Sequence, residues 1–429
     1  MDNVTHTLAG LVAARAALYL RDRRAPAGGP ALAFATLTAS AFANNAPDLD
    51  FLYRSLTPGK LGYLLHHRGH THTLLASPVL ALFCLTLVAG LLRLRGQRLS
   101  RPEWGFLLAV SVAGGFLHVA MDFGNNYGVH PFWPLDDHWY YGDAIFIVDP
   151  WLMIALGGIV FGTTQSRVGR SLIGLILVLL LALAWFMALS GQTRAPSPAP
   201  HPWLAALLTA AAGAWLAWMR RSSPLARRWS GAAALLVFLG MQLVARGSVR
   251  ARVRSGLDPR FELSSLASTP LPGNPLCWSV LAAGVSGVQS ADPQYEVQHA
   301  LVSAWPALLP TKICGPALVR ATAPLEDPSP PLRELPGVAW GRRFRAPLAQ
   351  LQALSRDCVA SAFLRFARIP FWIQEGARAT LVGDARFDRS PALDFTDLPL
   401  ERGAECPRNL PPWQPPLELL EQGSQPIGP

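Results

Sequence analysis

The sequence predicts a mainly α-helical membrane protein, in which about eight transmembrane spans are followed by a small α+β domain outside the cytoplasm. Hydrophobic residues make up 51% of the 429 residues and charged residues only 15%, a charge content that is low for a soluble protein. Apolar runs recur at lengths near the roughly 20 residues that cross about 30 Å of hydrocarbon. Beyond residue 246 these runs end and the chain becomes rich in proline.

Six strong spans and two weaker ones account for the membrane part. The strong spans are expected at 73–92, 105–121, 144–163, 171–189, 203–219 and 231–245. The weaker ones are 4–20, which contains His6 and Arg15, and 30–46. A cleaved signal peptide is not expected, because no basic stretch precedes the first apolar run. We expect three parts: residues 1–163 with the polar site, 164–245 as additional scaffold helices, and 246–429 as the extracytoplasmic domain.

The positive charge indicates how the spans are oriented. The formal net charge of +10 comes mostly from arginine, since Lys60 and Lys312 are the only lysines. The arginines gather in alternate loops, as cytoplasmic loops do, so nucleic acid is not expected as a partner. Loops 44–72, 122–143 and 190–202 and the tail after 246 are then expected outside. This topology predicts a multi-pass protein of a bacterial inner membrane with a periplasmic C-terminal domain.

The densest polar feature is YLLHHRGHTHT, residues 63–73, with His66, His67, His70 and His72. Neutral imidazoles, together with carboxylates, are the ligands that borderline divalent metals prefer. His66 and His70 would share one face of a helix, whereas His70 and His72 would share one face of an extended chain. Gly69 argues against a continuous helix, and the pattern leaves open which pair points inward.

Other metal-ligand residue types lie at the same predicted membrane level. Asp2 and Asn3 precede the first helix as cap residues, and His6 lies one turn inside it. Asp48 and Asp50 follow the second span, and His118 and Asp122 share one face of the fourth because they are four residues apart. Asp149 begins the fifth. Ionisable groups at membrane depth are costly and usually functional or paired, so their convergence predicts a metal site.

Each candidate also has a structural interpretation. His6 could be a packed or capping histidine, Asp48 could cap a turn, and His118 with Asp122 could be a pair that satisfies itself. We nevertheless expect one or two divalent ions, zinc first and manganese or iron as alternatives. The predicted ligands are His6, Asp48, Asp50, His67, His72, His118 and Asp122.

Three further residues are predicted to be catalytic. Arg68 would stabilise developing negative charge, although an arginine here could also extend to the membrane interface. His70 or His130 would move the proton, and His130 could instead be a further ligand or an interfacial residue. Loop 122–143, which contains His130, also contains Trp133, Trp139, Tyr140 and Tyr141, which suggest an interfacial belt or a lid over the site.

The tail predicts a small domain with little chemistry of its own. Strand-like runs occur at 296–304, 338–344 and 379–387, and 346–366 shows helical spacing. The four tail cysteines, Cys277, Cys314, Cys358 and Cys406, permit two disulfides in an oxidising compartment, with three possible pairings. Cys84 is expected to be a core residue. The last twenty residues are expected to be disordered.

As a set, four motifs resemble a family of inner-membrane metal-dependent hydrolases that includes a LexA-regulated member. They are residues 1–7 (MDNVTHT), 47–50 (PDLD), 67–73 (HRGHTHT) and 118–122 (HVAMD), within about the first 150 residues. Thr73 stands where the family usually has serine. The resemblance implies a multi-spanning helical membrane protein with hydrolase activity. A fainter similarity, used only as analogy, is to the all-helical zinc-dependent phospholipase C group.

These observations favour a membrane-embedded metal-dependent hydrolase with its site at the periplasmic face. The metal would lower the pKa of a water molecule toward about 7, and a phosphoester or lipid-like small molecule is the expected substrate. A metal transporter or sensor using the same ligands is the alternative. It would need polar groups along a path through the bilayer, and the last three spans offer few. A purely structural membrane protein would bind no metal.

Overall fold

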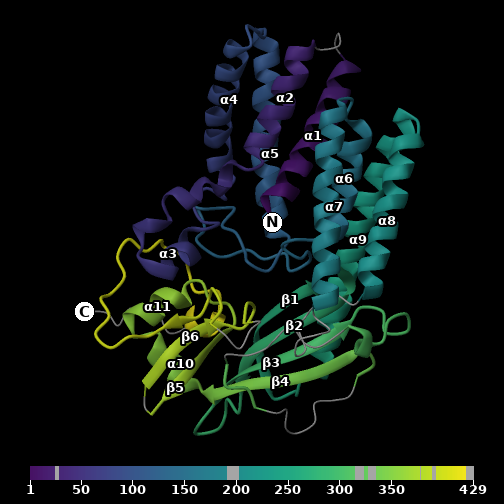
Figure 1. The fold of residues 1–429 in the computed structure, drawn as a ribbon. Helices are drawn as coiled ribbons and strands as arrows, with labels where there is room; N and C mark the ends of the chain where they lie inside the picture. Colours follow the sequence, from purple (N-terminus) through teal and green to yellow (C-terminus); the bar gives the residue numbers. More distant parts are fainter. Residues whose placement is uncertain are drawn as a thin grey trace.

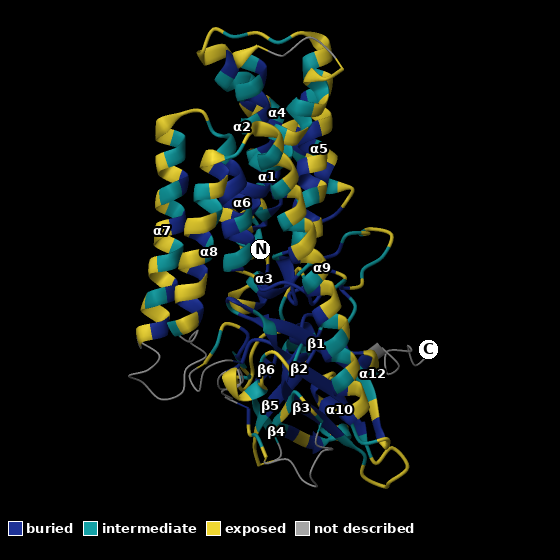
Figure 2. Ribbon diagram, turned by 90° about the vertical axis from the view of Figure 1, so that its right-hand side faces the viewer, coloured by how far each residue is buried: buried dark blue, intermediate teal, exposed yellow. Residues whose placement is uncertain are grey.

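A helical bundle stands on a β-rich C-terminal domain, and the N-terminus lies between the two (Figure 1). The computed structural model describes residues 1–24, 29–190, 202–314, 323–326, 335–376, 378–388 and 393–421. The loop expected over 190–202 lies almost entirely outside these residues. Figure 2 shows buried strands below and helices with exposed outer faces above.

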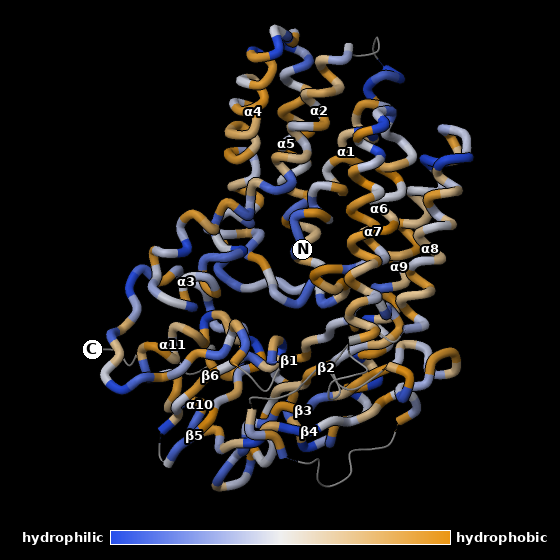
Figure 3. Tube along the Cα trace, in the orientation of Figure 1, coloured by the Kyte–Doolittle hydropathy of each residue, from blue (hydrophilic) through white to orange (hydrophobic). Residues whose placement is uncertain are grey.

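Eight helices occupy the eight stretches where spans were expected. They are α1 (Asn3–Asp22), α2 (Pro30–Ala43), α4 (Ala76–Leu94), α5 (Arg101–Phe123), α6 (Pro150–Thr163), α7 (Arg167–Ser190), α8 (Pro202–Arg221) and α9 (Pro224–Gly256). Among the described helices, α4, α5, α7, α8 and α9 are long and apolar enough to cross a membrane, whereas α2 and α6 are apolar but shorter. Apolar residues run along these helices, and hydrophilic residues gather at the bundle end away from the C-terminal domain (Figure 3).

Helix α1 joins the two halves of the bundle, because it packs against α2 and α5 on one side and α6 on the other. Asp2 caps it by accepting a hydrogen bond from the Thr5 amide at 3.0 Å. The Arg15 guanidinium donates to the Val160 carbonyl at 3.0 Å and to the Thr163 hydroxyl at 2.8 Å. Buried polar groups need such partners, which explains how this helix accommodates an arginine.

A chain segment of short helices links α2 to α4 beside the bundle end nearest the C-terminal domain. It contains the 3₁₀-helices η1 (Ala46–Leu52) and η2 (Arg54–Leu56) and the helix α3 (Gly59–His66). Helix α3 ends at His66, and the chain then turns sharply, with Arg68 at a φ of 61°. The histidine cluster is therefore a helix end followed by an irregular turn, as Gly69 suggested.

The C-terminal domain contains two antiparallel sheets. The first has the order β1 (Phe261–Leu271), β2 (Asn274–Ser286), β3 (Gln294–Ser303) and β4 (Val338–Pro347). The second has the order β5 (Pro370–Glu375), β6 (Arg378–Asp384) and β7 (Leu398–Pro399). The remaining short elements are η3 (Thr311–Ile313), α10 (Leu348–Leu354), α11 (Cys358–Leu364) and α12 (Glu418–Glu421).

The predicted strands at 296–304, 338–344 and 379–387 are confirmed as β3, β4 and β6. The helical stretch 346–366 is divided into α10 and α11. Strands β1 and β2 had no clear sequence signal, because β2 is buried along nearly its whole length. A strand that is covered on both faces loses the alternation of polar and apolar residues.

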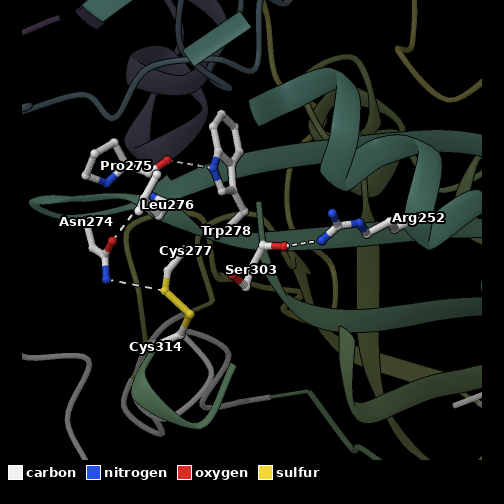
Figure 4. The surroundings of a disulfide bond; sticks show 8 residues. All are labelled: Arg252, Asn274, Pro275, Leu276, Cys277, Trp278, Ser303 and Cys314. Carbon is white, nitrogen blue, oxygen red and sulfur yellow. Dashed lines mark hydrogen bonds between the residues drawn. A yellow bond between two sulfur atoms is a disulfide. The ribbon is translucent and has the colours of Figure 1, made fainter. Parts of the chain in front are cut away.

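Helix α9 is longer than the predicted span. It continues past residue 245 to Gly256, and the buried side chains of Val249 and Val253 pack it against the first sheet. Two disulfides join Cys277 to Cys314 (Figure 4) and Cys358 to Cys406. Cys84 is a buried free cysteine, as expected.

The expectation that the last twenty residues are disordered is wrong for residues 410–421. The Trp413 side chain is only 1% exposed, and its indole nitrogen donates to the Leu65 carbonyl at 2.6 Å. The Gln414 main-chain amide likewise donates to the Asp137 carbonyl at 3.2 Å. Burial of a large aromatic ring offsets the entropy of ordering this segment. Residues 422–429 lie outside the described residues.

Candidate metal centre

Four potential ligand atoms converge at the end of the bundle nearest the C-terminal domain. They come from Asp48 on η1, His72 in the turn before α4, and His118 and Asp122 on α5, and all lie within 4.8 Å of one another. The two imidazole Nε2 atoms are 3.1 Å apart. Asp122 Oδ2 is 3.2 Å from His72 Nε2 and 3.3 Å from His118 Nε2. Asp48 Oδ1 is 3.5 Å from His72 Nε2 and 3.7 Å from His118 Nε2.

The outer contacts of the two imidazoles determine which nitrogens face inward without a proton. His118 Nδ1 lies 2.9 Å from the Asn44 carbonyl oxygen, which can only accept, so Nδ1 is the protonated atom. His72 Nδ1 lies 3.2 Å from the Thr71 hydroxyl oxygen and 3.3 Å from an Asp50 carboxylate oxygen. The negative carboxylate favours a proton on Nδ1, which is the same tautomer. Burial lowers the pKa of His72 well below its usual range, so this imidazole is neutral at pH 7. Both Nε2 atoms are therefore acceptors.

The centre thus brings four acceptors together with no hydrogen between them. Asp122 Oδ2 is buried and has no hydrogen-bond partner among the described residues. An unpaired buried carboxylate oxygen is costly, and a cation satisfies all four atoms at once. A tetrahedral zinc ion with ligand bonds near 2.0–2.1 Å places its ligand atoms about 3.3 Å apart. The five distances above, 3.1–3.7 Å, match that spacing.

Asp50 holds the turn that carries His72. Besides His72, its carboxylate accepts from the Arg68 amide at 2.8 Å and lies 3.2 Å from His67 Nδ1. These contacts support the positive φ of Arg68, a conformation that is uncommon for residues other than glycine. Asp50 therefore orients the ligand turn, although the sequence suggested that it binds the metal directly.

Arg68 is almost completely buried, with 1% of its side chain exposed. Its guanidinium contacts Asp122 Oδ1 at 3.1 Å and donates to the Asn125 side-chain oxygen at 2.7 Å. Because both terminal nitrogens are engaged, the geometry assigns Arg68 to holding Asp122. The other carboxylate oxygen of Asp122, Oδ2, faces the two imidazoles.

His6 lies directly behind the four ligand atoms. Its Nε2 is 3.3 Å from Asp122 Oδ1, and its ring stacks on His118 with centroids 3.8 Å apart. The Met1 main-chain nitrogen also contacts Asp122 Oδ1. His6 is thus part of the same buried cluster, although it is not one of the four atoms that surround a common point.

The other predicted site histidines are not among the four converging ligands. His67 stacks on Tyr63, with a side chain that is 12% exposed. The His70 ring packs against Trp133 and Trp413. His130 is buried against Trp413 and Trp139, and its Nδ1 lies 3.2 Å from the Arg68 carbonyl oxygen.

The surroundings of His130 do not suit a proton donor. Burial lowers its pKa to about 3, so the ring is neutral at pH 7. Its contacts instead support the backbone of the ligand turn from behind.

Several residues of the centre carried no sequence signal. Trp413 contacts the turn at Gly69, where an added Cβ would lie 2.9 Å from the indole ring. Asn44 contributes only its main-chain carbonyl, which any residue could supply. Asn125 was identifiable only as part of an Asn-Asn pair just after α5. A separate group, Asp136, Asp137 and His138, also has metal-ligand spacing, but it lies at the surface.

A family model described as YdjM inner membrane protein matches residues 1–191. No curated protein and no solved structure matches the chain. The matched part contains all four converging ligand residues and both residues that hold them, Asp50 and Arg68. The similarity to an inner membrane protein family and the five long apolar helices together support a membrane location. The histidine and aspartate cluster could hold a metal ion.

Proposed function

We propose that this protein is a membrane-embedded metal-dependent hydrolase whose active site lies at the periplasmic end of its helical bundle. The observation that carries the proposal is the convergence of four acceptor atoms, from Asp48, His72, His118 and Asp122, with no hydrogen among them. Two imidazoles and two carboxylates suit zinc, with manganese or iron as alternatives. A divalent ion held there would polarise a scissile bond and lower the pKa of water.

The chain's own residues divide into ligands, positioning residues and a proton carrier. Asp50 and the Asn44 carbonyl keep His72 and His118 in the tautomer that presents Nε2 inward, as hydrogen bonds to metal ligands commonly do. Arg68 holds Asp122. We assign general acid–base catalysis to His67, because Asp50 orients its Nδ1 and the ring is partly exposed, an arrangement that catalytic Asp–His pairs share.

The surroundings of Asp48 and Asp50 support a lipid-like substrate. Both are on η1, which carries three large apolar side chains that are exposed: Leu49, Phe51 and Leu52 are 38%, 45% and 79% exposed. Exposed apolar groups next to a polar site at the end of a membrane bundle favour a molecule with an apolar part. A phosphoester of this kind, cleaved by water, is the substrate class that we propose.

The C-terminal domain supports the proposed orientation. Its two disulfides are typical of oxidising compartments such as the periplasm. The arginine-rich loops lie at the opposite end of the bundle (Figure 3), where the positive-inside rule places the cytoplasm. Both observations support the proposal that the metal centre and the C-terminal domain lie on the periplasmic side.

Elemental analysis of the detergent-purified protein tests the ligand set. We expect a stoichiometric divalent metal in the wild type and its loss in His72→Ala. His138→Ala is the matched control, because it removes a histidine from the surface group and should leave the metal in place. Retention in His72→Ala with loss in His138→Ala would move the ion to the surface group and refute the proposed centre.

Activity is then measured on the metal-loaded protein. Phosphodiesters and phospholipids in mixed micelles should be hydrolysed by the wild type and not by His72→Ala. His67→Ala should keep the metal but lose about 10²–10⁴-fold in rate, the usual contribution of a general acid or base. Metal uptake into proteoliposomes without any hydrolysis would instead establish the transporter alternative.

A further inference from the structure

A polar cleft of about 540 Å³ lies where α9 leaves the bundle and meets the C-terminal domain. Its walls come from the loop between α5 and α6, the end of α9, the first half of β1 and the chain around 414–418. Three arginines, Arg250, Arg254 and Arg368, line it. None of the four proposed metal ligands lines this cleft, so it is a separate site.

The arginines are only partly neutralised by their neighbours. Arg250 and Arg368 share the buried carboxylate of Asp143, at 3.0 Å and 2.9 Å. Glu418 supplies a second carboxylate at the cleft, while Arg254 is exposed. Three guanidinium groups against two carboxylates leave a positive charge. A molecule with a negatively charged group complements such a cleft.

Further polar side chains lie along α9 from the cleft toward the membrane-spanning part of the bundle. Gln242, Arg246, Arg250 and Arg254 follow one another at intervals of four, so each lies about one turn after the previous one in a stripe that winds slowly around the helix. Both polar side-chain atoms of Gln242 and Nε of Arg246 are buried without a hydrogen-bond partner in the described part of the chain. Buried polar atoms are rarely left unpaired, so this stripe has hydrogen-bonding capacity that the protein itself does not use.

We propose that this cleft binds the phosphate group of a phosphorylated molecule. Arg254 and the Arg250 nitrogens that do not contact Asp143 are its main contacts, because the planar guanidinium matches a phosphate in bidentate geometry. The phosphate can belong to a phospholipid headgroup, since α9 leads directly from the apolar bundle to the cleft, or to a soluble phosphate ester. The binding site does not depend on the metal centre.

Calorimetric titration of the detergent-purified full chain, stripped of metal with a chelator, tests this site. Inorganic phosphate and phosphatidylglycerol in micelles are titrated separately, with diacylglycerol micelles as the lipid that lacks a phosphate. Binding of inorganic phosphate supports a soluble ester as the ligand, and binding of phosphatidylglycerol alone supports a lipid headgroup. Diacylglycerol should not bind. Because no metal is present, the result is independent of the proposed hydrolase activity.

Two cleft variants and one control make the test specific. Arg254→Gln removes an exposed charge and should raise the Kd about tenfold or more, the size expected for losing a charge-assisted hydrogen bond. Arg250→Lys keeps the charge but loses the planar fork, and should also weaken binding. Arg260→Gln removes a surface arginine paired with Asp258 and should change the Kd less than twofold. Equal effects of Arg254→Gln and Arg260→Gln, or no binding of either phosphate probe, would overturn the proposal.

Discussion

Two polar clusters of this protein contain buried carboxylates, and the carboxylates face different partners in each. In the C-terminal domain, Asp384 faces Arg386, with contacts of 2.7–3.1 Å from Nε and Nη2 of the guanidinium. The remaining Arg386 nitrogen, Nη1, donates to the Asn126 carbonyl at 2.6 Å. In the metal centre, Asp48 and Asp122 instead face the acceptor nitrogens of His72 and His118. In the first cluster the Arg386 guanidinium contacts both carboxylate oxygens of Asp384. In the second, the Arg68 guanidinium contacts Oδ1 of Asp122 and leaves Oδ2 directed at the two imidazoles.

This difference distinguishes a buried ion pair that serves only the fold from a buried cluster that is suited to bind a metal. Buried ions are tolerated when each is paired and its hydrogen bonds are complete, and the Asp384–Arg386 pair meets both conditions. The metal centre meets these conditions only in part. Arg68 and the Met1 main-chain nitrogen contact Asp122 Oδ1, whereas Oδ2, which faces the two imidazoles, has no hydrogen-bond partner among the described residues. Asp50 meanwhile lies against His72 and holds it in place. Rigid support of acceptors that lack a cation is what a preformed metal site requires.

The largest expected effect on stability comes from breaking the Asp384–Arg386 pair. Asp384→Asn leaves the fully buried Arg386 guanidinium without its counter-ion, and loss of one partner of a buried pair typically costs about 3–5 kcal/mol. Thermal unfolding of the purified protein measures this loss. Asp258→Asn, at an exposed pair with Arg260, is the control and should leave the unfolding temperature unchanged. A stable Asp384→Asn protein would show that the two clusters do not differ as described.

Metal removal should have the next largest effect, and only at the other cluster. A ligand at about 100 times its Kd stabilises the folded state by about 2.7 kcal/mol. Adding a chelator should therefore lower the unfolding temperature of the wild type. Asp122→Asn, which weakens the site, should unfold at the same temperature with and without chelator. Asp384→Asn should keep the chelator response of the wild type, and the comparison fails if Asp384→Asn loses this response.

A buried imidazole in the first sheet, that of His299, makes the stability of the folded state depend on pH. His299 lies 3.0 Å from the Ser279 hydroxyl, and burial lowers its pKa to about 4. The unfolded chain binds this proton below about pH 6.5, so the folded state loses stability as the pH falls from about 6.5 to about 4. The slope is about 1.4 kcal/mol per pH unit, with no contribution above that range.

The variant His299→Gln measures the contribution of this imidazole to the pH dependence of stability. It should reduce the slope of the free energy of unfolding between pH 4 and 6.5 by about 1.4 kcal/mol per pH unit. The remaining slope comes from other buried imidazoles, such as His72 and His130, whose pKa burial also lowers. An equal slope in wild type and His299→Gln would show that other groups cause the acid sensitivity.

The sequence alone could suggest the four converging residues because local rules place them. His118 and Asp122 share a helix face at a spacing of four, and Asp48 follows Pro47, which lies shortly after the end of α2. The same reasoning could not separate His72 from His67 and His70, since the turn after α3 is irregular and its direction depends on the Asp50 contact with the Arg68 amide. Local spacing determines side-chain direction only within regular elements.

Rules of local spacing could not predict the contacts between residues that are far apart in the sequence. Trp413 is far from Gly69 and His130 in the sequence, yet it packs against both. The helical extension of α9 past residue 245 was also missed, because an apolar span ends where its charged residues begin although the helix itself continues. Both features connect the C-terminal domain to the bundle, and no periodicity within a single segment indicates them.

The smallest effect should come from this connection. Trp413→Phe keeps an aromatic ring against His130 but removes the indole donor to the Leu65 carbonyl. Loss of one such hydrogen bond should cost about 1–3 kcal/mol, because the buried carbonyl is left unpaired. If the C-terminal domain supports the ligand turn, the metal Kd should rise together with this loss of stability.

Trp372→Phe, at a buried tryptophan that donates to Gln350 in the same domain, is the matched control. It should lower stability by a similar amount and leave the metal Kd unchanged. A metal Kd that is equal in both variants would mean that the metal centre is independent of the C-terminal domain.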